Sequence, residues 1–568
     1  MKLFRKIQKW FENQGNLYYL FLIILIVPNI VLCFTEPMPL VAKVCNVLLP
    51  FSIYHMIMSW SGNCGKTFWI LFPFLFFGAF QIVLLYLFGQ SVIAVDMFLN
   101  LVTTNPGEAL ELLDNLIPAI IIVVLLYIPA LVLAAVAVSK KRRLSEMFVR
   151  RERKRAGITV IAGILSLVAA YLFDARYELK SDLYPANVCY NIALAFQRTA
   201  QTQHYAETSK DFTFQAKTTR PEKNREVYVM VIGETSRAAN WSIYGYNRNT
   251  NPELTKIKGL TAFSHVLTES NTTHKSVPML MSSVTAHDFN SIYRQKGIIT
   301  AFKEAGYRTA FFSNQRYNHS FIDFFGKEAD ICDFIKEDTG DGGYNPSDDE
   351  LLKLVAAELA ENVSKQFIVL HTYGSHFNYR ERYPADNAFF LPDFPVDAEL
   401  KYKDNLINAY DNSIRYTDNF LARLIRMLQE QDIDAAMLYT SDHGEDIFDD
   451  DRHLFLHASP VPSYYQIHVP FLVWMSDNYR KNYPDLFKNA EINRQKNISS
   501  SASFFQTMLE LGGIDTPCRN DSLSVINASY TEKNRVYLND HNEARSLNDI
   551  GMREEDFTML QMKGIVYR

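Results

Sequence analysis

The chain has 568 residues, of which 57 are Lys or Arg and 62 are Asp or Glu, so its formal net charge is −5. This near balance offers no general attraction to nucleic acid, and the length allows more than one domain. No internal repeat or low-complexity segment is present, which excludes solenoids and disordered tails. The hydrophobic content of 48% averages two unlike parts, because long apolar runs gather in the first third.

Five apolar runs, each near the ~20 residues that cross a hydrocarbon core, precede residue 174. The first could be a signal peptide, but it is too long for a typical apolar signal region and no cleavage site follows it, so we expect it to remain as an anchor. Residues 1–174 are therefore predicted to form five transmembrane helices. The runs are Leu17–Phe34, Pro39–Trp60, Phe68–Leu87, Leu116–Val138 and Gly157–Phe173.

Basic residues are sharply partitioned among the connections between these runs. They precede the first run and fill residues 140–155 before the fifth, whereas the loop Gly89–Asn115 has none. Lys and Arg are retained on the cytoplasmic side, so the N-terminus is expected to be cytoplasmic and everything after Phe173 to be exported. A nucleic-acid patch at 140–155 is the weaker reading, because two apolar runs enclose it.

The exported part is expected to contain an interfacial helix and linker at 175–222 and an α/β domain at 223–568. Short buried-strand patterns alternate there with helical ones, which predicts βαβ units and a largely parallel sheet. The expected strands are Val227–Ile232, Thr309–Phe312, Phe367–Leu370, Ala436–Tyr439 and Val469–Trp474, and the expected helices are Asp348–Val363 and Asn405–Gln429.

Four of these strands run out into polar side chains. Glu234 follows the first strand, Asn314 the second, His376 the third, and Asp442 with His443 the fourth. Taken singly, each of these residues is more probable as a helix cap or a surface residue than as a functional one. In a parallel sheet, however, the carboxyl ends share one edge, so these side chains are expected to converge on one crevice. No CxxC pair is present, so a metal there would rest on oxygen and imidazole ligands.

Thr273 lies in a Ser/Thr-rich segment between the first two strands. Ser276 is expected to cap a helix with Pro278 in its first turn, so that Thr273 precedes a helix N-terminus, which favours anions. A threonine hydroxyl needs a metal or a base to become a nucleophile. Without metal ligands elsewhere, an ordinary loop would be the better interpretation.

Together these motifs resemble the phosphoethanolamine transferases of Gram-negative bacteria. The resemblance rests on Gly233–Arg237, Tyr244–Tyr246, Asn249–Pro252, Thr273 with Pro278, and Ser441–Glu445. It implies a membrane domain of five transmembrane helices in the inner membrane and a periplasmic α/β domain of sulfatase or alkaline-phosphatase fold. The cysteines that flank the nucleophile loop in colistin-resistance (polymyxin-resistance) members are missing here, so the acceptor stays open between lipid A and core oligosaccharide.

The resemblance also implies residue roles. Glu234, Thr273, Asp442 and His443 would hold Zn²⁺, with Thr273 also the nucleophile that carries phosphoethanolamine taken from phosphatidylethanolamine. Further implied or weaker assignments are His376 and His457 for phosphoethanolamine or a second zinc, Asn105 and Glu108 for donor lipid or as plain loop residues, Glu445 for orienting His443 or Lys275, and Asn314 as an outer support.

Two alternatives remain at this point. One is another enzyme of the same fold, a membrane-anchored phosphoglycerol transferase or a sulfatase-like hydrolase, although Thr273–Ser276 lacks the Cys/Ser-x-Pro-x-Arg setting of sulfatases. The other is an inactive sensor or scaffold that binds a headgroup. His453 and the acidic run Asp449–Asp451 are expected to be solvated surface.

Overall fold

The computed structural model describes residues 6, 9–36, 38–88, 92–98, 106–221, 225–336 and 345–567, with only the backbone of 87–88 and 106–115. It contains two compact units, which divide between residues 197 and 198 within a helix. Asn105 and the side chain of Glu108 lie outside the described residues, so the predicted contacts of both with donor lipid stay predictions. The six cysteines are all free.

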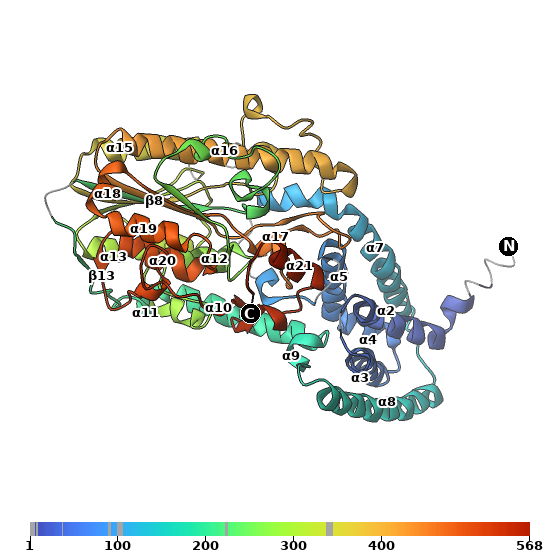
Figure 1. Ribbon diagram of the computed structural model, residues 1–568. Helices are drawn as coiled ribbons and strands as arrows, with labels where there is room; N and C mark the ends of the chain where they lie inside the picture. The colour runs from blue at the N-terminus through green and yellow to red at the C-terminus, as the bar shows by residue number, and fades with distance from the viewer. Residues whose placement is uncertain are drawn as a thin grey trace. The chain divides into compact units, whose positions relative to one another are not determined.

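The first unit is helical (Figure 1). Four helices are long and apolar enough to span a membrane, and a bent pair, α4 and α5, makes a fifth candidate. The pair is bent by 61°, because Pro73 lacks an N–H and its ring clashes with the carbonyl one turn earlier. The helices are α2 Gln14–Thr35, α3 Leu40–Met58, α4 Cys64–Ile70, α5 Phe72–Phe88, α7 Pro106–Ser139, α8 Glu146–Phe173, α9 Leu179–Asp182 and α10 Ala186–Gln203.

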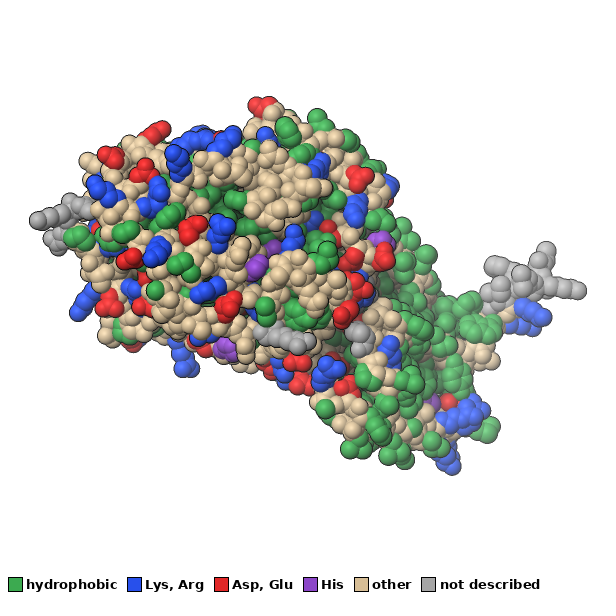
Figure 2. All heavy atoms as spheres, in the orientation of Figure 1, with side chains coloured by type: hydrophobic (Ala, Val, Ile, Leu, Met, Phe, Trp, Pro, Cys, Tyr) green, Lys and Arg blue, Asp and Glu red, His purple; other side chains and the backbone are tan. Residues whose placement is uncertain are grey.

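The outer faces of these helices are apolar. On α8, Ile158, Leu165 and Phe173 are between 63% and 76% exposed, and Figure 2 shows hydrophobic side chains crowded over the helices of this unit. Exposed apolar faces of this extent are typical of helices surrounded by lipid. The predicted apolar helices are therefore confirmed as four continuous helices and one bent pair that is a fifth candidate.

The second unit is built on a seven-stranded sheet of order β3-β11-β8-β2-β7-β5-β6. β8, β2, β7, β5 and β6 run parallel, whereas β11 is antiparallel to both of its neighbours. All five predicted strands are present, and β3 and β6 are additional. The strands are β2 Glu226–Gly233, β3 Leu260–Phe263, β5 Arg308–Ser313, β6 Ile331–Phe334, β7 Lys365–His371, β8 Asp434–Ser441 and β11 Phe471–Met475.

Helices cover both faces of this sheet (Figure 1), with α15 and α16 on one face and α12, α13, α19 and α20 on the other. The central strands β2, β7 and β8 are buried throughout. The helix predicted at Asn405–Gln429 is present as α16, and its apolar side chains from Leu406 to Leu428 are buried in the core. The helices are α11 Tyr205–Thr208, α12 Thr273–Leu280, α13 Ile298–Glu304, α14 Phe321–Gly326, α15 Asp349–Ala360, α16 Lys403–Gln429, α17 Tyr464–Ile467, α18 Asp477–Asn482, α19 Pro484–Asn493, α20 Ser500–Leu511 and α21 Glu554–Met562.

Short two-stranded pairs tie the loops of this unit together. They are β1 Lys217–Thr218 with β13 Ile514–Asp515, β4 Val266–Leu267 with β12 Ile498–Ser499, β9 Asp446–Ile447 with β10 Phe455–Leu456, and β14 Val536–Leu538 with β15 Ala544–Ser546. The β9–β10 pair follows β8 directly, so it lies at the carboxyl edge of the sheet.

Candidate active site

The carboxyl ends of β2 and β8 bring three chemically active side chains together. These strands are parallel neighbours, and Gly233 at the end of β2 pairs with Ser441 at the end of β8. The next residues, Glu234 and Asp442, therefore leave the sheet side by side, and His443 follows. All three side chains are buried.

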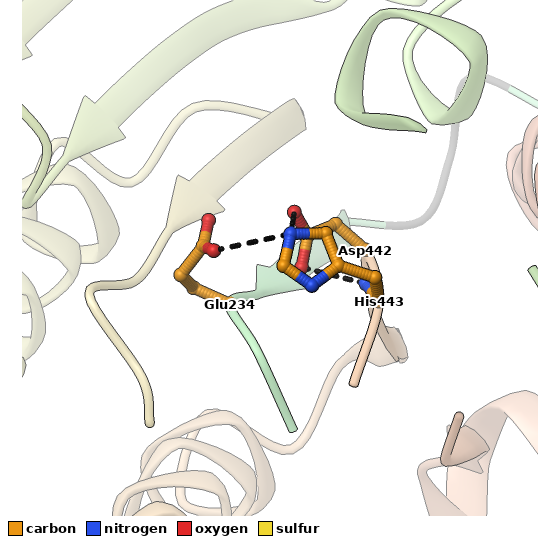
Figure 3. Close-up of side chains that lie close together, drawn as sticks. All are labelled: Glu234, Asp442 and His443. Carbon is orange, nitrogen blue, oxygen red and sulfur yellow. Dashed lines mark hydrogen bonds and ion pairs between the residues drawn. The ribbon is translucent and has the colours of Figure 1, made fainter. Parts of the chain in front are cut away.

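Thr273, the first residue of α12, meets this group. Its Oγ1 lies 3.2 Å from Glu234 Oε1 and 3.1 Å from His443 Nε2. His443 Nε2 is also 3.6 Å from Glu234 Oε1 and 3.2 Å from Asp442 Oδ2. Figure 3 shows the imidazole edge directed at both carboxylates. Four residues from three segments of the chain thus converge on one point.

Backbone groups fix the orientation of these side chains. His443 Nδ1 lies 2.9 Å from the carbonyl oxygen of Gly444, which accepts a hydrogen bond, so the proton of the neutral ring belongs on Nδ1 and the lone pair on Nε2. Asp442 Oδ1 accepts from the backbone N–H groups of Thr235 and His443, at 3.1 and 2.7 Å. Asp442 Oδ2 and His443 Nε2 are thereby left facing the shared point.

The site is electrostatically suited to a cation. Burial, with the neighbouring Asp442, raises the pKa of Glu234 well above its usual range, and burial raises the pKa of Asp442 to about 6. Burial lowers the pKa of His443 well below its usual value. A cation between two buried carboxylates and a neutral imidazole would favour the ionised carboxylates. The ligand atoms of the three residues lie within 4.8 Å of one another. With the Thr273 hydroxyl, they form a four-donor set that suits zinc.

The helix that carries Thr273 begins earlier than expected. Thr272 is the N-cap and Thr273 the first residue of α12. The prediction that Ser276 caps this helix is wrong, because Ser276 lies inside the first turn and both its N–H and its hydroxyl bond to the carbonyl of Thr272, at 2.9 Å each. Pro278 is tolerated inside the helix, which ends two residues later at Leu280.

Two further histidines border the group. The ring of His457 lies 4.2 Å from that of His443 and 6.0 Å from that of His376, measured between centroids. His376 Nδ1 is 2.6 Å from the carbonyl oxygen of Phe377, and its ring stacks on Tyr373. Both predicted histidines therefore lie beside the predicted ligands, and each has a ring nitrogen not committed to these contacts.

Comparison with known proteins identifies the fold of this site. The family model described as "Sulfatase" matches residues 226–514, just over half of the chain. The chain belongs to the sulfatase family. A second model, "Phosphoethanolamine transferase EptA/EptB", matches residues 63–200. The two matches together confirm the resemblance noted in the sequence.

A curated relative of this sulfatase-family chain is consistent with both family matches. It is 31% identical over 296 residues to Kdo(2)-lipid A phosphoethanolamine 7''-transferase of Escherichia coli, covering 51% of each chain. The chain spans about half the length of the first curated relatives that it matches.

Solved structures confirm the predicted fold class. The integral membrane protein lipooligosaccharide phosphoethanolamine transferase A of Neisseria meningitidis matches with a TM-score of 0.71 and 20% identity, over 90% of this chain and 97% of that one. The C-terminal periplasmic domain of EptC from Escherichia coli, in complex with zinc, matches with a TM-score of 0.55 and 23% identity, over 60% and 97%.

Glu445 and Lys275, which border the predicted ligands, make contacts other than those expected. Glu445 was expected to orient His443 or Lys275, but its Oε2 lies 3.4 Å from His457 Nδ1, while Lys275 Nζ donates to the carbonyl of Asn539 at 3.0 Å. The reason is the antiparallel β9–β10 pair, whose register places Asp446 opposite Leu456, so that the flanking residues Glu445 and His457 come together. Glu445 therefore supports the second histidine and not the predicted metal ligand.

Asn314 does not contact the predicted ligands directly but acts through Asp348. Its amide donates to Asp348 Oδ1 at 2.8 Å, and the Asp348 carboxylate accepts from the backbone N–H groups of Tyr373 and Gly374, at 2.8 and 3.0 Å. Burial raises the pKa of Asp348, and these hydrogen bonds oppose that rise. Asn314 thus helps to fix the loop that leads to His376.

Arg237 is a site residue that the sequence did not single out beyond its motif. It is buried, and its Nη1 donates to the carbonyl of Glu445 at 3.0 Å and to Asp449 Oδ2 at 2.6 Å. The prediction that Asp449 belongs to a solvated run is therefore wrong, whereas Asp451 and His453 are exposed as expected. No local pattern distinguishes Asp449 from its acidic neighbours, because its partner lies 212 residues away.

Proposed function

We propose that this protein transfers phosphoethanolamine from phosphatidylethanolamine to an envelope glycolipid, lipid A or its core oligosaccharide. The observation that carries the proposal is the Thr273 hydroxyl held 3.1 Å from His443 Nε2 and 3.2 Å from Glu234 Oε1 at the carboxyl edge of a sulfatase-family sheet. The match of residues 63–200 to a phosphoethanolamine transferase model, and the activity for which the Escherichia coli relative is named, support this choice of group and acceptor.

Zn²⁺ is the proposed cofactor. Glu234, Thr273, Asp442 and His443 would hold it, and the zinc complex of the EptC domain supports this choice of metal. Bound there, zinc would lower the pKa of the Thr273 hydroxyl and so generate a nucleophile near neutral pH.

The proposed first step forms a bond between Thr273 Oγ1 and the phosphorus of the donor and breaks the bond from phosphorus to the diacylglycerol oxygen. His457 is placed to give that oxygen its proton from Nε2, because its Nδ1 lies beside the Glu445 carboxylate at 3.4 Å. His376 Nδ1 lies against a backbone carbonyl, so the Nε2 of the neutral ring carries the lone pair and would accept a hydrogen bond from the ammonium group of phosphoethanolamine.

The second step reverses these roles. An oxygen of the acceptor forms the new bond to phosphorus while the bond to Thr273 breaks, and His457 Nε2 takes the proton of an acceptor hydroxyl. Because Thr273 is the first residue of α12, the positive end of that helix would stabilise charge on the phosphoryl oxygens.

We also propose that the N-terminus is cytoplasmic and that the sulfatase-family unit lies in the periplasm. The basic residues at 140–155 and the apolar helices support this orientation. A reporter enzyme that is active only in the periplasm, fused after residue 203, should be active. The same reporter fused after residue 143 should not be.

The decisive experiment uses purified protein with fluorescent phosphatidylethanolamine. Labelled diacylglycerol should appear, and intact-mass measurement should find one added phosphoethanolamine group that peptide mapping assigns to Thr273. Thr273→Ala should give neither. The absence of both products from zinc-loaded wild-type protein would refute the proposal, and turnover of phosphatidylglycerol alone would favour a phosphoglycerol transferase.

A further inference from the structure

The segment 388–396, which precedes α16, exposes apolar side chains on its outer side. Phe389 is 59% exposed, Leu391 65% and Phe394 70%. Figure 1 shows this segment as the gold loop that projects beyond α16. Three large apolar side chains within six residues of a loop form a local patch and are not isolated surface residues.

The polar side chain of the same segment faces inward. Asp393 is only 7% exposed. It accepts a hydrogen bond from the hydroxyl of Tyr383 at 2.7 Å and lies 3.1 Å from Arg380 Nε. Asp393 is the only charged residue between 388 and 396, so this stretch presents no exposed charge. The charged side chain of this loop therefore faces inward and its large apolar side chains face outward, which is the reverse of an ordinary surface loop.

Three asparagines hold the backbone of the segment, which will be called the apolar loop. Asn405, Asn408 and Asn412 recur at intervals of three and four residues and so share one face of α16. Asn412 Oδ1 accepts two N–H groups, and the amides of Asn408 and Asn405 donate to two carbonyls. The bonded groups are Phe389 N at 3.0 Å, Phe390 N at 2.8 Å, Pro392 O at 2.7 Å and Pro395 O at 3.2 Å.

These hydrogen bonds fix the backbone of the apolar loop in the conformation that leaves its apolar side chains exposed. The helix thereby satisfies these four backbone groups, which do not need water as a partner. Arg248 and Arg415 also lie over the rings of Phe390 and Phe389, each at 4.1 Å from the ring centroid. These two guanidinium groups therefore contact the loop in addition to the asparagines.

The apolar loop lies at the carboxyl edge of the sheet, the same edge at which Thr273 meets Glu234 and His443. The chain runs from β7 through the loop into α16 and then into β8, and β7 and β8 both lie parallel to β2. α16 must therefore run back along the sheet, so its first turn, near Lys403, lies at the carboxyl edge of the strands. At 27 residues, α16 spans the sheet from that edge to the other.

We propose that the apolar loop enters the interfacial region of the lipid bilayer beside the candidate active site. The inference rests in part on the proposed function, which gives Thr273 two lipid substrates. The chain's own apolar helices would keep the bilayer at a high effective concentration. A segment of exposed Phe and Leu that carries no exposed charge of its own suits lipid, whereas a specific protein interface would need polar groups at its rim. Asp386 and Asp397 lie at the ends of the loop, which limits entry to its tip.

The first test measures lipid contact directly. Full-length protein with Leu391→Cys, in a Cys189→Ser background, is labelled with the fluorophore NBD and reconstituted in nanodiscs of phosphatidylethanolamine and phosphatidylglycerol. The same background without the added cysteine gives the baseline. The matched control is Glu430→Cys, at the exposed opposite end of the α16 segment. Lipids brominated on the upper acyl chain should quench the label at 391 by about half or more, and the label at 430 by little.

Absence of quenching at 391, or equal quenching at both positions, would overturn the inference. A blue shift at 391 that increases with protein density without lipid quenching would show that a second copy covers the loop, and it would also overturn the inference. Because this readout needs no turnover, it stands even if the proposed transferase activity is absent.

The second test measures use of membrane lipid. The variant Phe389→Ser with Leu391→Ser and Phe394→Ser should raise KM for phosphatidylethanolamine in nanodiscs by about three- to tenfold, because partial burial of each side chain in lipid is lost. Its kcat/KM for a short-chain, water-soluble phosphatidylethanolamine should stay within about twofold of wild type. Equal loss on both substrates would show a structural role only and contradict insertion.

Discussion

Thr273 Oγ1 lies 3.1 Å from His443 Nε2, although 170 residues separate the two in sequence. The relationship joins the first turn of a helix to the end of a strand, and it places a hydroxyl at the point where two buried carboxylates and an imidazole meet. Among the four converging residues, Thr273 supplies the hydroxyl, and His443 Nε2 and Glu234 Oε1 lie close enough to activate it. The first prediction follows from this contact.

Thr273→Ala should lower kcat by at least about 10³-fold, because the variant has no nucleophile. Its midpoint of thermal unfolding should change little, since the lost methyl and hydroxyl are only partly buried. Steady-state assays with fluorescent phosphatidylethanolamine measure the first effect and scanning fluorimetry the second. Thr273→Ser is the matched control and should retain the covalent intermediate. An alanine variant with activity similar to wild type would rule out Thr273 as nucleophile.

Removal of metal should abolish turnover and lower the midpoint of thermal unfolding. Dialysis against a chelator leaves Glu234 and Asp442 buried together without a counter-charge, and ligand loss destabilises the folded state by mass action. Added Zn²⁺ should restore both properties. In Asp442→Asn, zinc should produce a much smaller thermal shift. Full activity after verified removal of zinc would contradict the assignment.

Glu445→Gln should lower kcat by about 10- to 100-fold by weakening the support of His457. The contact of 3.4 Å between Glu445 Oε2 and His457 Nδ1 predicts that Glu445→Gln and His457→Ala are not additive. A double-mutant cycle on kcat measures this coupling. Additive effects would show that the two residues act separately, and Lys275→Gln, which has a different contact, serves as the control.

Asp449→Asn should destabilise the fold by about 3–5 kcal/mol, because it leaves the buried guanidinium of Arg237 without its carboxylate partner. Chemical or thermal unfolding measures the change. Asp451→Asn alters an exposed neighbour and should have an effect within about 0.5 kcal/mol of zero. Similar effects of the two substitutions would contradict the special role of Asp449.

Asp418 should make stability depend on pH. Burial raises its pKa to about 7, compared with about 4 in an unfolded chain. Between these values the folded state binds a proton that the unfolded state does not, so the free energy of unfolding falls as pH rises from about 4 to about 7. Asp418→Asn lacks this loss, so its midpoint of thermal unfolding relative to wild type should increase from pH 5 to pH 8. The exposed Asp404→Asn should show no such trend.

The predicted strands were found because each carries a continuous apolar run that is buried on both faces, as in β2 and β8. The edge strand β3, which pairs with β11, was missed, because it has only four residues and alternates in burial. The start of α12 was misplaced for a related reason. Thr272 and Ser276 are both good caps by type, and only the hydrogen bonds to the carbonyl of Thr272 decide between them.

The sequence by itself determined the apolar helices, the parallel core of the sheet and the convergence of Glu234, Asp442 and His443, because periodicity, run length and strand-end position are local properties. Only the tertiary structure decided that Glu445 faces His457, that Asp449 pairs with Arg237 and that three asparagines of α16 hold an apolar loop outward. The physical reason is that side-chain partners are chosen by packing between distant segments, where distance and desolvation act and sequence spacing carries no information.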